Sequence, residues 1–175
     1  MKIIRDGAIV EDDWIRLDDT AALPASGKVL VSWTRWQADK AALKARRNVG
    51  VTLTPALDPE ELKDDLPALA LVAVPFNFIQ PKPEGGRSFD GRGYSQARLL
   101  RDRHAYTGEI RAVGDVFRDA MFYMHRCGVN AFELKAGADL QDALKGLRDF
   151  SFGYQGAADD PTPIFRRRSD GTARA

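Results

Sequence analysis

Cysteine is nearly absent from this 175-residue chain, which contains only Cys127. A single thiol cannot form a disulfide framework within the chain. It also cannot hold an iron–sulfur cluster by itself, because such clusters are bound by about four thiolates. Histidine is almost as scarce, with only His104 and His125. Since neither histidine stands at zinc-ligand spacing from another His or Cys, no metal site is expected.

Long apolar runs and an excess of either charge are also missing. No apolar stretch approaches the roughly 20 residues that span a bilayer. The opening MKIIRDGAIVEDDW carries acidic residues where a signal peptide would be continuously apolar. A net charge of +1 gives no global attraction to nucleic acid or to a membrane surface. We therefore expect a soluble, cytoplasmic protein without membrane or nucleic-acid partners.

Two common catalytic motifs do not occur in the chain. Without G-x-x-x-x-G-K-[ST], a P-loop nucleotidase is not expected. Without G-x-S-x-G, the nucleophile elbow of α/β hydrolases is missing. The residues alone therefore name no reaction, catalytic residue, cofactor or oligomeric state.

The residues that are present suit one globular domain. The chain is 44% hydrophobic and 29% charged, which is ordinary for a protein with a sizeable core. We predict a single α/β domain over residues 1–155. Residues 156–175 are rich in Ala, Asp, Pro and Arg and are predicted to form a mobile tail.

Short apolar runs alternate with helical patterns along the chain. Asp6-Gly7 between two apolar runs predicts an N-terminal hairpin. The alternation that follows predicts a five-stranded, mainly parallel sheet with right-handed helical crossovers. We favour a doubly wound, flavodoxin-like strand order, 2-1-3-4-5, with an open half-barrel in sequential order as the alternative. The expected strands lie at residues 28–33, 50–54, 69–74, 108–113 and 129–134, and the expected helices at residues 36–47, from 58, 93–104, 116–126 and 138–147.

The stretch DGRGYS, residues 90–95, joins a long loop to one of these helices. A helix N-terminus exposes unpaired N–H groups and the positive end of a dipole, and so stabilises anions. Glycines allow a ligand to approach the backbone, while Arg92, Arg98 and Arg101 add positive charge. The alternative interpretation is an ordinary loop-to-helix junction that Asp90 or Ser95 caps.

The position of this stretch favours a binding site. In doubly wound sheets, ligands bind beyond the carboxyl ends of the strands, where the strand order reverses. In the favoured order, residues 34–36 and the loop at 75–94 meet at that point. We therefore predict a site for a small anion or a nucleotide. Its candidate ligand-binding residues are Asp90, Gly91, Arg92, Gly93, Tyr94, Ser95, Arg98, Asp115 and Arg118.

Three further features have plainer interpretations. The run from Gly91 resembles the dinucleotide motif G-x-G-x-x-G, but Gln96 occupies its third glycine position. Cys127 falls on the apolar stripe of its helix, which predicts a buried structural thiol. His104 is expected to be an exposed cation at a helix end.

Four segments resemble one bacterial family. They are IIRDGAIVEDDWIRL, DGRGYSQARLLRDR, GEIRAVGDVFRDAMFYMHRCGVNAFEL and DALKGLRDFSFGYQ. In these segments the chain resembles domain-of-unknown-function family 934, whose members are described as oxidoreductases involved in sulfite reduction. Residues 77–88 depart from the family pattern and look like an insertion.

The resemblance implies a role in assimilatory sulfite or sulfate reduction. The family has no assigned catalytic residues, so none can be transferred to this chain. Because the chain lacks the thiolates for a cluster, it cannot itself be the catalytic sulfite reductase. We expect an accessory protein that binds a small anion or nucleotide. The alternatives are a non-enzymatic module that docks on a sulfur-assimilation reductase through residues 76–79 and the tail, and an enzyme that depends on flavin or nicotinamide.

Overall fold

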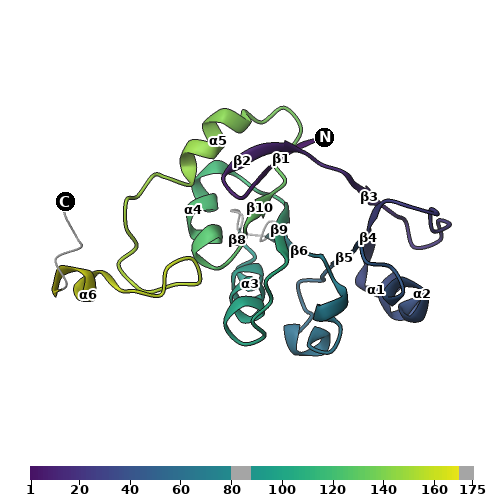
Figure 1. The fold of residues 1–175 in the computed structure, drawn as a ribbon. Coiled ribbons are helices and arrows are strands. Elements are labelled where there is room, and N and C mark those ends of the chain that lie inside the picture. Colours follow the sequence, from purple (N-terminus) through teal and green to yellow (C-terminus); the bar gives the residue numbers. More distant parts are fainter. Residues whose placement is uncertain (80–87, 170–175) are drawn as a thin grey trace.

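The computed structural model describes residues 1–79 and 88–169, and it is built around one curled, mainly parallel sheet (Figure 1). The strand order is β2-β1-β10-β9-β6-β5-β4-β3. All neighbouring pairs are parallel except β1 with β2 and β1 with β10. The strands are β1 (Lys2–Arg5), β2 (Ala8–Glu11), β3 (Trp14–Arg16), β4 (Lys28–Ser32), β5 (Val49–Thr52), β6 (Leu71–Phe76), β9 (Glu109–Gly114) and β10 (Ala131–Phe132).

The α/β class and the mainly parallel sheet were predicted, but the favoured strand order was wrong. The parallel strands follow each other in sequence order, as in the half-barrel alternative. A doubly wound sheet needs helices on both faces. Here one face of the central strands carries a small apolar cluster that includes Leu30 and Leu71, the neighbours of Gly50 on adjacent strands. Trp14 of β3 packs against the same small cluster.

The helices pack on the outer face of the sheet. They are α1 (Trp33–Ala38), α2 (Lys40–Lys44), α3 (Arg92–Asp102), α4 (Arg118–Arg126) and α5 (Leu140–Gly146), with short 3-10 turns η1 (Pro59–Leu62) and η2 (Leu66–Ala68). The last helix, α6 (Ile164–Ser169), lies apart from the sheet. The helix predicted at residues 36–47 is divided at Asp39. The predicted start at Asp58 is capped as expected, with Glu60 N donating to its carboxylate at 2.9 Å, but it produces only a 3-10 turn.

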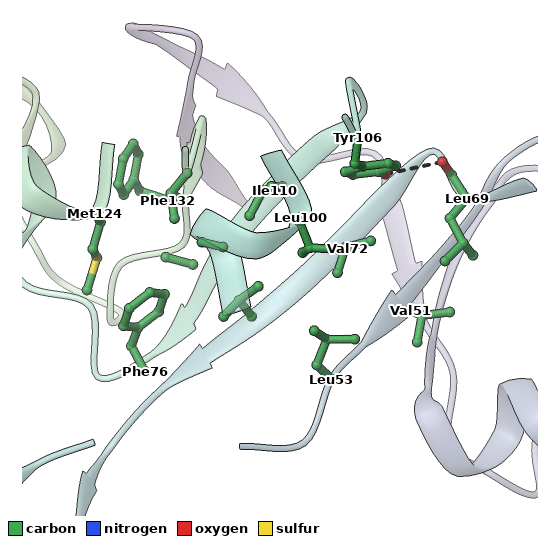
Figure 2. Close-up of a cluster of buried hydrophobic side chains, with 14 of the residues drawn as sticks. Val51, Leu53, Leu69, Val72, Phe76, Leu100, Tyr106, Ile110, Met124 and Phe132 are labelled. Carbon is green, nitrogen blue, oxygen red and sulfur yellow. Dashed lines mark hydrogen bonds between the residues drawn. The ribbon is translucent and has the colours of Figure 1, made fainter. Parts of the chain in front are cut away.

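The main core lies between the strands and these helices (Figure 2). Val72 and Phe76 of β6 are fully buried beside Leu100 of α3. Tyr106 closes one end of this layer, and its hydroxyl donates to Leu69 O at 3.1 Å. Burial raises the pKa of Tyr106, so the phenol stays protonated. The core therefore fixes α3 firmly on the central strand of the sheet.

The N-terminal hairpin was correctly predicted, and it leads into a strap across the open side of the half-barrel. Residues 11–14, here called the strap, run from β2 at one sheet edge to β3 at the other (Figure 1). Asp12 in the strap accepts a hydrogen bond at 2.9 Å from Arg111 of β9, whose side chain is fully buried. Arg111 also pairs with Glu109 at 2.7 Å. Two carboxylates thus compensate a buried guanidinium and fasten the strap.

Two segments stand outside the main sheet. Strands β7 (Phe78–Ile79) and β8 (Ser88–Phe89) form a small antiparallel pair before α3, and the rest of the predicted insertion lies outside the described residues. The chain after α5 first passes beside α3 and α4, and its last part extends away from the body to α6 (Figure 1). Within the predicted tail, Ala158 N donates to Arg126 O at 3.0 Å. Residues 170–175 lie outside the described part. In the described ranges, no helix combines the length and apolarity of a membrane span.

Candidate functional site

The start of α3 is occupied by the protein's own carboxylate. Asp90, which is buried, accepts hydrogen bonds from Arg92 N at 3.1 Å and from Arg92 Nη2 at 2.6 Å. The Arg92 side chain is the main reason that the pKa of Asp90 lies below its usual value. The N-cap position of α3 belongs to Gly91, and Asp90, one residue earlier, satisfies the first helical N–H group and pairs with the Arg92 side chain.

Gly93 sets the distance between α3 and the sheet. A Cβ at this position would lie 2.8 Å from Pro75 O and 3.0 Å from the Phe76 ring. Only glycine lets the helix approach β6 so closely. Gly91 is different, because a Cβ there would meet nothing within 4 Å.

Tyr94 begins a cluster of aromatic rings that extends from α3 to α4. Its ring centroid lies 5.0 Å from Phe76, 6.1 Å from Phe89 and 4.9 Å from Tyr123. Burial is the main cause that raises the pKa of Tyr94. The phenol is therefore neutral at physiological pH and is suited to packing or hydrogen bonding.

A cavity of about 940 Å³ lies beside Tyr94, between α3, α4 and the segment after α5. Ser95 and Arg98 of α3 also line it, so the motif helix contributes three of the predicted site residues. Six aromatic side chains dominate the walls. Within residues 1–79 and 88–169, the lining is Tyr94, Ser95, Arg98, Leu99, Phe122, Tyr123, Arg126, Cys127, Phe150, Phe152, Gly153, Tyr154, Gln155, Gly156 and Ala157.

The charged groups in this lining are all basic. Arg98 and Arg126 are present, and none of the described residues in the lining carries a carboxylate. Arg98 donates through Nε to Asp102, and in the described ranges its terminal nitrogens have no hydrogen-bond partner. Cys127 is buried in the same wall, where burial is the main cause that raises its pKa. The predicted buried thiol is confirmed, and a cavity with this lining favours a ligand that is both aromatic and anionic.

The other predicted site residues lie elsewhere. Asp115, after β9, accepts from Phe78 N at 2.9 Å and pairs with Lys135 at 2.5 Å. Arg118 pairs with Asp149 at 2.8 Å, on the side of α4 that faces α5. Neither Asp115 nor Arg118 lines the cavity.

Arg101 is used structurally at the far end of α3. Its guanidinium donates to Gly128 O at 3.0 Å, Gly108 O at 2.9 Å and Asn130 Oδ1 at 3.1 Å. It therefore adds no charge to the start of the helix. Its contacts instead join α3 to the chain before β9 and β10.

Two side chains near α3 correct the sequence interpretation. The side chain of His104 is only 8% exposed and lies 3.8 Å from Glu60, so the expected exposed cation was wrong. The chain turns back after α3, with His104 N donating to Leu99 O, and this places the ring against η1. Gln96, at the third position of the glycine motif, donates to Thr54 O and Leu57 O at 2.8 Å each. It holds a neighbouring loop.

Sequence reasoning missed the wall of the cavity that follows α5. Phe150, Phe152 and Tyr154 alternate along an irregular segment, and all three are exposed on one side. Their spacing of two residues, which is typical of an extended segment, was the available signal. Their meeting with α3 depends on tertiary structure that no local pattern records.

Comparison with known sequences places this region within one family. The sequence model of a family described as bacterial protein of unknown function (DUF934) matches residues 50–165. The match includes both helices of the cavity and the segment after α5. No curated protein matches the chain. The match extends over more than half of the sequence, and the chain therefore belongs to the DUF934 family.

Proposed function

We propose that this protein is an accessory protein of assimilatory sulfite or sulfate reduction that binds an anion or nucleotide in the cavity between α3 and α4. The observation that carries the binding site is the lining of that cavity, where aromatic rings surround two guanidinium groups without a carboxylate. The pathway comes from the family resemblance. The lone cysteine supports an accessory role, since a catalytic cluster needs about four thiolates.

The cavity is a better site than the helix start itself. At the start of α3, Asp90 already accepts the first N–H group and the Arg92 side chain. An anion would have to displace this buried carboxylate. One turn later, Ser95 and Arg98 face open volume, and a planar fork such as that of Arg98 suits phosphate or sulfur oxyanions.

A gene deletion tests the pathway. The deletion strain should grow on cysteine but fail or grow slowly on sulfate or sulfite, and the wild-type gene should restore growth. Normal growth of the deletion strain on sulfate would contradict the assignment.

A thermal-shift screen tests the site with sulfite, sulfate, phosphate, adenosine 3′,5′-bisphosphate, NADPH, FMN and FAD. A ligand at 100 times its Kd should stabilise the fold by about 2.7 kcal/mol. For a domain of this size the shift is several degrees, at about 2–4 °C per kcal/mol. Arg98→Ala should reduce the shift, while Ile15→Ser, a change at an exposed position on β3, should leave it unchanged. A shift that Arg98→Ala leaves intact would remove the cavity from the proposal.

A docking module is the second candidate, and an exposed apolar patch favours it. Phe78, Ile79 and Phe117 are 36%, 51% and 39% exposed, and the rings of Phe78 and Phe117 stack at 6.0 Å. Phe78→Ser with Ile79→Ser should abolish co-purification with the sulfite reductase of the same bacterium. Ile15→Ser, equally apolar and exposed, is the matched control. Retained association in the double variant would exclude this surface.

A further inference from the structure

The wall of the cavity that follows α5 has the properties of a movable cover. We propose that the cavity takes a nucleotide, a planar heteroaromatic ring that carries phosphate, and that residues 150–157 form a lid that closes over it under the control of Arg126. The inference rests on the proposed function for the location of the site. It adds the chemical class of the ligand and the way the site opens.

The lid differs from the rest of the lining in structure and exposure. Residues 150–157 contain no helix or strand, whereas the opposite walls belong to α3 and α4. Phe150 and Tyr154 of the lid are 63% and 74% exposed, although they line the cavity. In contrast, Cys127 on α4's side is only 8% exposed. Segments with few buried contacts open at low free-energy cost, so the lid is the part of this wall that moves.

Arg126 is the side chain that holds the lid against α4. Its side chain is only 11% exposed, and Nη2 donates to Gln155 O in the lid. Nη1 lies 3.4 Å from Asp159 Oδ1, just beyond the lid. Gly153 lies directly against this guanidinium, where any Cβ would overlap it. Arg126 thus acts as a latch, and it is a positioning residue for the site.

The lining favours a nucleotide over a bare anion. A small oxyanion would use Arg98 and Ser95 but would leave six aromatic side chains and most of the 940 Å³ without a contact. A heteroaromatic base stacks on such rings, and each stacking contact contributes about 1–3 kcal/mol. Phosphate then pairs with the terminal nitrogens of Arg98. A nucleotide carries both a base and a phosphate, and it therefore contacts the aromatic rings and Arg98 at the same time.

The chain contains its own reporter for lid opening. Cys127 is the single cysteine of the sequence, and it is buried in the cavity wall. Its rate of modification by a thiol reagent at fixed pH therefore measures access to the cavity, without any need for an activity. Adenosine 3′,5′-bisphosphate or NADPH should slow this modification at least tenfold. Adenosine alone or phosphate alone should slow it much less.

Variants separate the latch from the ligand contact. Arg126→Ala should speed the modification of Cys127 at least tenfold in the free protein. The Arg126 charge lowers the pKa of this thiol, so its loss alone would slow the reaction, and acceleration must reflect access. Gly153→Ala should also speed it, because the added methyl group displaces the guanidinium while α4 keeps its sequence. Arg98→Ala, the matched control, should not accelerate the reaction but should lose the protection by nucleotide.

Each outcome decides one part of the inference. If neither Arg126→Ala nor Gly153→Ala accelerates modification, the lid is wrong. If phosphate or sulfite protects Cys127 as well as any nucleotide does, the ligand class is wrong, while the proposed function stands. Asp65→Asn, a destabilising change far from the cavity, must not accelerate the reaction as much as Arg126→Ala does. If it does, modification follows global unfolding and the latch is refuted.

Discussion

Replacing Gly93 by alanine should loosen the contact between α3 and β6, on which the cavity depends. The added Cβ would lie 2.8 Å from Pro75 O, a backbone atom, and 3.0 Å from the Phe76 ring. A backbone carbonyl within the sheet cannot move aside as the end of a flexible side chain can. The helix must therefore shift, and Tyr94, Ser95 and Arg98 shift with it.

The expected magnitude is the difference between two opposing effects. Overpacking a well-packed contact costs about 1–3 kcal/mol. Replacing glycine by alanine where the backbone allows it stabilises by about 0.4–1 kcal/mol, mainly by restricting the unfolded chain. The net loss should be about 1–2 kcal/mol, or about 2–8 °C in Tm for a chain of this length.

Gly91→Ala is the matched control for this prediction. It lies two residues earlier in the same motif, has φ of −77°, and an added Cβ would meet nothing within 4 Å. It should gain about 0.4–1 kcal/mol. Urea unfolding of both variants measures the contrast, and nucleotide protection of Cys127 should weaken only in Gly93→Ala. A Gly93→Ala protein as stable as Gly91→Ala would refute the reasoning.

Three other predictions concern the groups that hold the sheet and helices together. Asp65 is buried, accepts a hydrogen bond from Trp36 and pairs with Lys40 and Lys44. Burial raises the pKa of Asp65, but these three partners together lower it by more, so its pKa in the folded protein lies below that in the unfolded chain. The stability that Asp65 contributes is therefore complete above the unfolded pKa of about 3.9, and it is lost as the pH falls through the folded pKa. As the pH is lowered from 6 to 3, the urea midpoint should fall less steeply in Asp65→Asn than in the wild type. Equal slopes for the two proteins would contradict this. Arg101→Met should lower the free energy of unfolding in urea by about 2–3 kcal/mol, because the carbonyl groups that accept hydrogen bonds from Arg101 lose their donor. A loss below about 0.5 kcal/mol would show that water replaces the guanidinium. Arg111→Met should cost about 3–5 kcal/mol, because it removes the buried partner of Asp12 in the strap and leaves Glu109 with Arg5 alone. Thermal unfolding should show a smaller loss when Asp12→Asn is added.

Much of the fold was predictable because its signals are local. The apolar run of β6, the Asp139 cap of α5 and the positive φ of Gly128 after α4 follow from short stretches of sequence. Strand order was not predictable in this way. Alternating strands and helices fit both a doubly wound sheet and a half-barrel, and the choice depends on which strands pair. Here β5 lies between β4 and β6, and no local pattern in the sequence records that pairing.

The site was predictable only in its first part. The motif lies at the start of α3, whose Tyr94, Ser95 and Arg98 line the cavity. Within the described part of the chain, Arg92, Arg98 and Arg101 all have partners, but Arg98 uses only its Nε atom, toward Asp102, and of the three it alone lines the cavity. A sequence shows how many arginines a motif has, and only the folded chain shows which of them keeps donors for a ligand.

The pairing of β1 with β10 also determines when the sheet can finish folding during synthesis of the chain. Arg5 stands opposite Ala131, so the earliest strand finds its neighbour only after most of the chain has left the ribosome. At about 5–20 residues per second, that delay is on the order of ten seconds. During this time the apolar Ile3 and Ile4, both fully buried in the finished protein, are uncovered. The hairpin with β2 gives them local shelter, and a mutation that weakens its Asp6-Gly7 turn should therefore reduce the yield of folded protein more than it reduces the stability of the molecules that fold.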